Sequence, residues 1–166
     1  MDVFWIDPTL AITTRPRGGD WLSDELSALK REGVSVVVSC LTDPEEHELG
    51  LAHEAQVARE QGLRFVRLPI EDRGTPANTD AFATVVDGLV ADRSSGRRIA
   101  VHCRQGLGRA PLVAASILVS SGTPAGDAWT LIAARRQQTV PDTDEQREWV
   151  SGLARRRRRA GLAQGS

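Results

Sequence analysis

Residues 101–111 read Val-His-Cys-Arg-Gln-Gly-Leu-Gly-Arg-Ala-Pro and predict a strand, a tight loop and a helix in direct succession. The strand is expected over 98–102 and an apolar helix over 109–121. The loop between them carries Gly106 and Gly108, which allow it to curl tightly. A strand that passes through a short loop into a helix is typical of an α/β protein, and this arrangement places Cys103 at the carboxyl end of the strand.

Outward from this stretch, predicted strands alternate with predicted helices. Further strands are expected over 3–6, 10–13, 34–40 and 63–68, and helices over 21–32, 44–61 in whole or part, 80–92, 124–137 and 143 to about 158. Residues 34–40 form a β-branched run, which is typical of a strand buried on both faces. The alternation predicts an α/β fold with a mostly parallel, twisted central sheet of about four to five strands flanked by helices. One domain is expected over 1–158, followed by a frayed tail over 159–166.

Composition excludes several classes of protein. The chain has 166 residues, of which 40% are hydrophobic and 26% charged, and this composition favours one soluble globular domain. A net charge of −1 gives no electrostatic reason to expect a nucleic-acid partner. No apolar stretch approaches the ~20 residues that a membrane helix needs. The two cysteines make no disulfide framework, so we expect a reduced, cytoplasmic monomer. They form no zinc spacing with the three histidines, and no metal or organic cofactor is expected.

The loop after the 98–102 strand has the features of an anion site. Its backbone N–H groups form a nest that can hold phosphate, and the helix that begins at Arg109 adds the positive end of its dipole. Cys103 lies at the base, where such a nest favours the thiolate. Arg109 can hold two phosphoryl oxygens with its planar guanidinium. We therefore expect phosphoryl transfer to Cys103. The expected phosphate-binding residues are Arg104, Gln105, Gly106, Leu107, Gly108 and Arg109. The alternative is that Cys103 and His102 only fill the core.

The pattern His102-Cys103-x-x-Gly106-x-Gly108-Arg109 resembles the signature loop of the cysteine-based protein tyrosine and dual-specificity phosphatases. The resemblance extends over about 3–150. Residues 68–76, Leu-Pro-Ile-Glu-Asp-Arg-Gly-Thr-Pro, are similar to the compact atypical dual-specificity group. The resemblance implies a metal-independent phosphatase that forms a phosphocysteine intermediate. Its substrates would be phosphotyrosine, and also phosphoserine or phosphothreonine, of proteins.

A carboxylic acid is needed to protonate the leaving group. Asp72 stands 31 residues before Cys103, in a loop over 69–76, and the resemblance implies that this is the mobile acid loop. Glu71 and then Asp43 are the rival carboxylates. The alternative is that Asp72 only shapes a turn. Gln146 lies in a segment that resembles the glutamine-bearing segment of the family, where the glutamine orients the attacking water.

Ala110 departs from the family, since most members have serine or threonine after the loop arginine. The stretch Gly-Leu-Gly-Arg-Ala-Pro is similar to the loop of the phosphatases of regenerating liver. This departure leaves open a second function, a slow-turnover or inactive module that binds phosphate or phosphopeptides. A third class, sulfur transfer on a rhodanese-like fold, is disfavoured by Asp72 and Arg109. The run from Arg155 to Arg159 is similar to the basic tail of the same group. It is interpreted either as a contact for acidic lipid or as a solvated helix end.

Two further residues bear on regulation and substrate choice. Cys40 ends a predicted strand at the same sheet edge as Cys103, so neighbouring strands would allow a reversible disulfide between them. The alternative is that Cys40 fills the core. Arg104 is the only basic residue among the variable loop positions, which favours a singly phosphorylated group on a protein.

Overall fold

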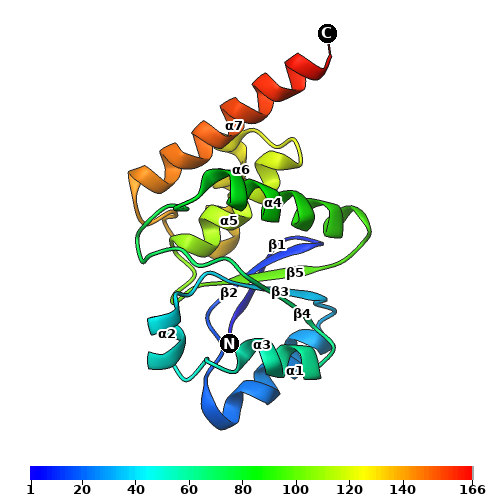
Figure 1. The fold of residues 1–166 in the computed structure, drawn as a ribbon, viewed down its shortest axis with the longest axis vertical. Helices are drawn as coiled ribbons and strands as arrows, with labels where there is room; N and C mark the ends of the chain where they lie inside the picture. Colours follow the sequence, from blue (N-terminus) through cyan, green and yellow to red (C-terminus); the bar gives the residue numbers. More distant parts are fainter. Residues whose placement is uncertain (166) are drawn as a thin grey trace.

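A five-stranded sheet crosses the middle of the molecule, with strands in the order β1-β2-β5-β3-β4 (Figure 1). The structure is a computed structural model, and it describes residues 1–165. The strands are β1 Val3–Asp7, β2 Leu10–Thr13, β3 Val36–Ser39, β4 Arg64–Arg67 and β5 Ile99–His102. Only the β1–β2 pair is antiparallel, and the other three pairs are parallel. The prediction of a mostly parallel sheet is confirmed, and β5, which precedes Cys103, lies at its centre.

Helices cover both faces of the sheet. On one face lie α1, Leu22–Arg31, and α3, Glu54–Glu60. On the other lie α4 Thr79–Ser94, α5 Arg109–Ser120, α6 Ala125–Arg136 and α7 Asp144–Gln164 (Figure 1). Val36 and Val38 pack into the core on the α5 face, whereas Val37 packs into the core on the α1 face. The β-branched run is therefore buried on both sides, as its composition predicted.

Helix α5 is the element that positions the candidate site. Every residue from Arg109 to Val119 is buried, and the helix packs against α4, α6 and α7. An apolar helix that is buried all round leaves little freedom for the loop that joins it to β5. The loop over 103–108, called the signature loop below, is thus held between a central strand and a central helix.

Several predicted boundaries differ from the structure. The strand predicted over 34–40 is shorter in the structure, where β3 runs over Val36–Ser39. The helix predicted over 44–61 is present only in part, as α2, Asp43–Glu48, and α3. A capping box between Thr42 and Glu45 starts α2. Gly50, with φ of +69°, turns the chain before α3, in a left-handed conformation that favours glycine.

The C-terminal helix is longer than predicted. Residues 159–164, expected to fray, continue α7 to Gln164, so the expected end near 158 was too early. The stretch contains alanine, leucine, arginine and glutamine, which are good helix formers. Ser166 lies outside the described residues, and the division between a domain over 1–158 and a tail stays a prediction. No helix within residues 1–165 is both long and apolar enough to cross a membrane.

The arginine run lies on this last helix. Arg155 pairs with Glu148 at 3.0 Å, and Arg157 pairs with Asp87 at 2.7 Å. Part of the positive charge is therefore balanced within the molecule. Contact between the run and acidic lipid stays a prediction.

Candidate active site

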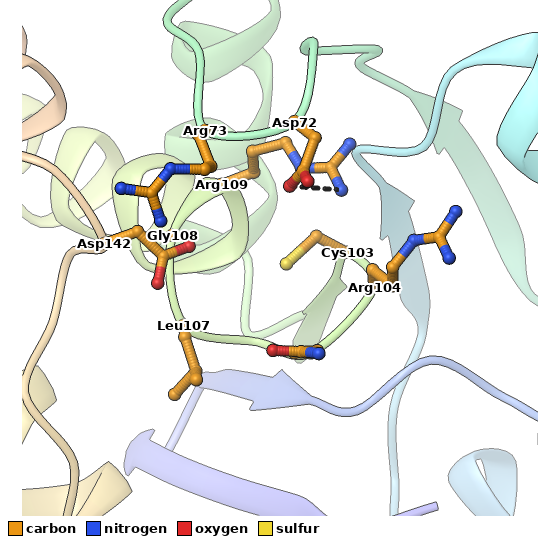
Figure 2. Close-up of a pocket in the computed structure, with 9 residues that line it drawn as sticks. Asp72, Arg73, Cys103, Arg104, Leu107, Gly108, Arg109 and Asp142 are labelled. Atoms are coloured by element: carbon orange, nitrogen blue, oxygen red, sulfur yellow. Dashed lines mark ion pairs between the residues drawn. The ribbon is translucent and has the colours of Figure 1, made fainter.

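A pocket of about 130 Å³ opens beyond the carboxyl end of β5 (Figure 2). It is lined by Asp72, Arg73, Cys103, Arg104, Gln105, Leu107, Gly108, Arg109 and Asp142. The structure thus brings the acid loop, residues 69–76, to the signature loop, as the positions of the two loops in an α/β sheet predicted.

The signature loop wraps around the sulfur of Cys103. Cys103 is only 3% exposed, and the backbone N–H of Gly106 donates a hydrogen bond to its Sγ at 3.2 Å. The two glycines are required for different reasons. Gly106 has φ of +74°, which disfavours any residue with a Cβ. A Cβ on Gly108 would clash with a carboxylate oxygen of Asp142, so a larger residue there would displace the Asp142 side chain from the loop.

Arg136 supports the loop from below and was not predicted. It is buried, its Nε donates to the carbonyl of Gly106 at 3.0 Å, and an Nη donates to the carbonyl of Gln105 at 3.3 Å. Its guanidinium lies 4.0 Å from the ring centre of Phe4. Burial lowers the pKa of Arg136, while the negative charge of Cys103 acts in the opposite direction. Arg136 lies in the last turn of the helix predicted over 124–137, and nothing in the sequence indicates that its side chain contacts the signature loop.

Arg109 is held by a carboxylate that the sequence analysis also missed. Its Nη1 and Nη2 donate to the two oxygens of Glu45 at 2.7 and 2.9 Å, and Nη1 also donates to the carbonyl of Ile70 at 2.9 Å. The hydrogen bond from Arg109 lowers the pKa of Glu45 to about 2. Arg104 reaches Glu45 at 3.4 Å and Glu48 at 3.0 Å. The capping-box spacing of Thr42 and Glu45 was the available signal for this residue.

Asp72 lies above Cys103, on the far side of the pocket from the loop (Figure 2). Its carboxylate is 3.3 Å from Nη2 of Arg109, and its side chain is 65% exposed. The neighbouring Arg73 has φ of +59°, an unfavourable left-handed conformation in the middle of the acid loop. Such strain is common in loops that place a functional side chain.

The rival carboxylates lie elsewhere. Glu71 lines a separate hollow beside Pro44 and Ala77. Asp43 pairs with Arg67 on the surface. Asp72 is therefore the acid-loop carboxylate that faces Cys103.

Gln146 is brought near the pocket, but its amide is engaged. It is fully buried, its Nε2 donates to the carbonyl of Gly74 at 3.0 Å, and its Oε1 accepts from the N–H of Thr143 at 3.3 Å. The side chain therefore ties the acid loop to the start of α7. Its expected role in orienting water stays a prediction. Asp142, which comes shortly before it, lines the pocket and was not singled out from the sequence.

The remaining predicted residues lie around the loop. Ala110 is buried at the second position of α5. Cys40 is a buried free thiol outside the pocket, and its N–H donates to the carbonyl of His102 at 2.9 Å. Burial, helped by the negative charge of Cys103, raises the pKa of Cys40 well above its ordinary value.

His102 lies behind the loop and is buried. Its Nε2 is 2.7 Å from an oxygen of Glu54, and its Nδ1 is 3.4 Å from the carbonyl of Cys103. Glu54, at the start of α3, is also buried and was not predicted as part of the site.

The arrangement suits transfer of a phosphoryl group. The thiol of Cys103, which accepts a hydrogen bond from a loop N–H, shares one pocket with the guanidinium of Arg109 and the carboxylate of Asp72, and phosphoryl transfer to sulfur uses groups of these kinds. Within residues 1–165, no group of three or more histidine, cysteine, aspartate or glutamate side chains is arranged to hold a metal ion.

Comparison with known proteins gives consistent results. A family model described as "Polymorphic toxin system, DSP-PTPase phosphatase" matches residues 12–123. The protein tyrosine phosphatase PRL-1 of Leishmania major is 29% identical over 120 residues, which cover 68% of this chain and 67% of that protein. The protein tyrosine phosphatase type IVA 3 of Bos taurus is 25% identical over 142 residues, covering 84% and 76%. Among solved structures, kinase associated phosphatase superposes with a TM-score of 0.80 at 19% identity, over 90% of this chain and 91% of that one. This last likeness shows the fold.

Proposed function

Because this chain belongs to the DSP-PTPase phosphatase family and is a cysteine-dependent phosphatase of the protein tyrosine and dual-specificity type, we propose that it hydrolyses single phosphomonoesters on proteins through a phosphocysteine at Cys103. Phosphotyrosine is the expected substrate, and phosphoserine or phosphothreonine are expected to fit as well. The observation that carries the proposal is the placing of Cys103, Arg109 and Asp72 around one small pocket.

The proposed reaction has two halves. In the first, the Cys103 thiolate attacks phosphorus, and Asp72 gives its proton to the leaving oxygen. In the second, water attacks phosphocysteine, Asp72 takes a proton from that water, and the thiolate leaves. Arg109 would hold two phosphoryl oxygens throughout. Glu45 keeps the guanidinium in place from the side of α2, since it accepts one hydrogen bond from each terminal nitrogen. Nη1 gives its other hydrogen to the carbonyl of Ile70, so Nε–H and the second Nη2–H are the donors left for the phosphoryl oxygens.

Hydrolysis of para-nitrophenyl phosphate, followed by a panel of phosphopeptides, tests the proposal. We expect steady release of phosphate from the aryl ester and from at least one phosphotyrosine peptide. Stable peptide binding without release of phosphate would favour the alternative of a binding module.

Among residues 1–165, the basic side chains that line the pocket besides Arg109 are Arg73 and Arg104, and Arg104 is paired with Glu45 and Glu48. This charge pattern supports a substrate with one phosphate.

Ala110 is proposed to make breakdown of phosphocysteine the slow step. A hydroxyl at this position would donate a hydrogen bond to the departing thiolate, and the methyl group of alanine cannot. One such bond to a charged group is worth ~1.5–3 kcal/mol, or roughly 10- to 150-fold in rate. Rapid mixing of the wild type should show a burst of product, and Ala110→Ser should raise the steady rate and diminish the burst. A wild type without a burst, together with no gain in Ala110→Ser, would mean that formation of phosphocysteine limits turnover.

Cys40 is proposed to protect the nucleophile from oxidation. Ser39 and His102 are register partners on β3 and β5, so Cys40 and Cys103 leave adjacent strands at the same edge. Peroxide would convert the Cys103 thiolate to a sulfenic acid, which the Cys40 thiol then displaces, forming a disulfide and releasing water. The raised pKa of Cys40 should make this second step slow.

After mild peroxide, peptide mapping should find the linked peptides, and dithiothreitol should restore activity. In Cys40→Ser less activity should return, because a second peroxide can convert the unprotected sulfenic acid to the irreversible sulfinic acid. Equal recovery of the two proteins would contradict the proposal.

Both cysteines are free thiols, which is consistent with a reducing compartment. We propose a cytoplasmic location on that basis.

A further inference from the structure

His102 has an acceptor at each of its two ring nitrogens. Nε2 is 2.7 Å from a carboxylate oxygen of Glu54, and Nδ1 is 3.4 Å from the backbone carbonyl of Cys103. A carbonyl oxygen cannot donate, and an ionised carboxylate cannot donate either. A neutral ring carries a proton on one nitrogen only, so it would leave one of these contacts without a hydrogen. The geometry therefore suits a ring that carries both protons, which is an imidazolium.

Both side chains of the pair are buried. His102 is 2% exposed and Glu54 is 1% exposed. Burial disfavours the charged ring, but the negative charge of Glu54 and the hydrogen bond to it outweigh burial and raise the pKa of His102. Because imidazole is ordinarily more basic than a carboxylate, the shared proton belongs on the ring. A buried charge of one sign is tolerated when a charge of the other sign is in contact with it.

The other groups around His102 do not replace Glu54. On the neighbouring strands its register partners are Thr13 of β2 and Ser39 of β3, which are both neutral. Glu46 of α2 acts on the ring only through its charge, and more weakly than Glu54. The second oxygen of Glu54 has no hydrogen-bond partner among residues 1–165, so the ion pair with His102 is its principal contact.

We propose that Glu54 is a positioning residue that keeps His102 as an imidazolium behind Cys103, and that this buried cation stabilises the thiolate. The proposal rests on Cys103 being the nucleophile of the proposed function. It adds a residue from α3, on the opposite face of the sheet from α5, to the machinery that activates the sulfur. The effect would pass from Glu54 to the ring, and from Nδ1 of the ring to the backbone carbonyl of Cys103, the residue that carries the sulfur.

Glu54→Gln tests the negative charge of Glu54 while keeping a side chain of nearly the same shape. The amide oxygen of glutamine can still accept from Nε2, but the negative charge is gone. An opposite charge within ~4–6 Å changes the ionisation of a neighbouring group by at least about tenfold. The measurement is the rate at which iodoacetamide alkylates Cys103 as a function of pH, read by mass spectrometry of the Cys103 peptide. In Glu54→Gln, alkylation near pH 5.5 should slow by roughly tenfold, and the rates should converge at high pH.

The matched control is Glu60→Gln, which removes an equal charge from the exposed end of the same helix. Its alkylation profile should equal that of the wild type. In a His102→Asn background, Glu54→Gln should have no further effect, because the cation through which Glu54 acts is absent. A profile in Glu54→Gln that matches the wild type, in a protein with unchanged circular dichroism, would show that Glu54 only ties α3 to the sheet.

A second readout needs no variant. The nitrogen chemical shifts of His102 in the wild type at pH 7 should show both ring nitrogens protonated. A neutral ring would overturn the proposal even if Glu54→Gln failed to fold. Neither readout depends on turnover, so failure of this proposal and failure of the proposed phosphatase reaction remain distinguishable.

Discussion

Replacement of Cys103 by serine should lower turnover of para-nitrophenyl phosphate by on the order of 10⁴- to 10⁶-fold, as loss of a covalent nucleophile does in other enzymes. A serine hydroxyl at the base of the nest stays protonated, whereas a cysteine there can react as the thiolate. The nest, Arg109 and the Arg136 support are unchanged in this variant. Phosphate and vanadate should therefore still bind, since the anion contacts remain.

The controls for Cys103→Ser are a melting curve and an equivalent change at Cys40. Cys40→Ser removes a buried sulfur from outside the pocket and should leave most of the turnover intact in a protein that remains folded. Retention of more than a few per cent of activity in Cys103→Ser would mean that another group forms the covalent bond or that none is formed.

Asp72→Ala should lower turnover by ~10²–10⁴-fold on a substrate whose leaving group is a poor one, such as a phosphotyrosine peptide. The loss should be smaller on an aryl phosphate whose leaving group departs without a proton. This contrast separates a proton donor from a residue that only shapes the acid loop. A structural role would lower both rates alike.

Glu71→Ala is the matched control for Asp72→Ala, because Glu71 is the adjacent carboxylate and lines a different hollow. It should retain the turnover of the wild type on both substrates. If Glu71→Ala showed the loss that depends on the leaving group and Asp72→Ala did not, the two residues would exchange roles.

The residues that the sequence predicted share one property, which is that their positions follow from local chain geometry. Cys103 and Arg109 are joined by a short loop between a strand and a helix, and Asp72 follows the end of another parallel strand. In such a sheet these ends meet at one edge. The location of the pocket could therefore be predicted from three local features: the loop glycines, the apolar helix and the β-branched strand.

The residues that were missed come from elements whose approach depends on tertiary packing. Glu45 reaches Arg109 from α2, Arg136 reaches the loop from the end of α6, and Glu54 reaches His102 from across the sheet. Each looked in the sequence like an ordinary charged residue on a helix. Only the packing of these helices shows that the three side chains are buried and that each contacts the signature loop or a residue next to it.

The interruption between α2 and α3 could not be placed from hydrophobic spacing either. Helix α2 reads Asp-Pro-Glu-Glu-His-Glu, so it has no hydrophobic spacing from which its end could be placed, and the break depends on Gly50 in a left-handed conformation. This break has a functional consequence, because it lets α2 present Glu45 to Arg109 while α3 presents Glu54 to His102. One unbroken helix could not direct both side chains to these two places.

Trapping of the covalent intermediate tests the central claim most directly. The wild type is mixed with an aryl phosphate, quenched within the burst by denaturant at alkaline pH, digested and mapped by mass spectrometry under conditions that preserve phosphocysteine. The account predicts a phosphoryl group on the peptide that contains Cys103, and no such group when Cys103→Ser is treated in the same way. A burst of product with no phosphorylated Cys103 peptide, or a phosphoryl group trapped on another residue, would contradict it.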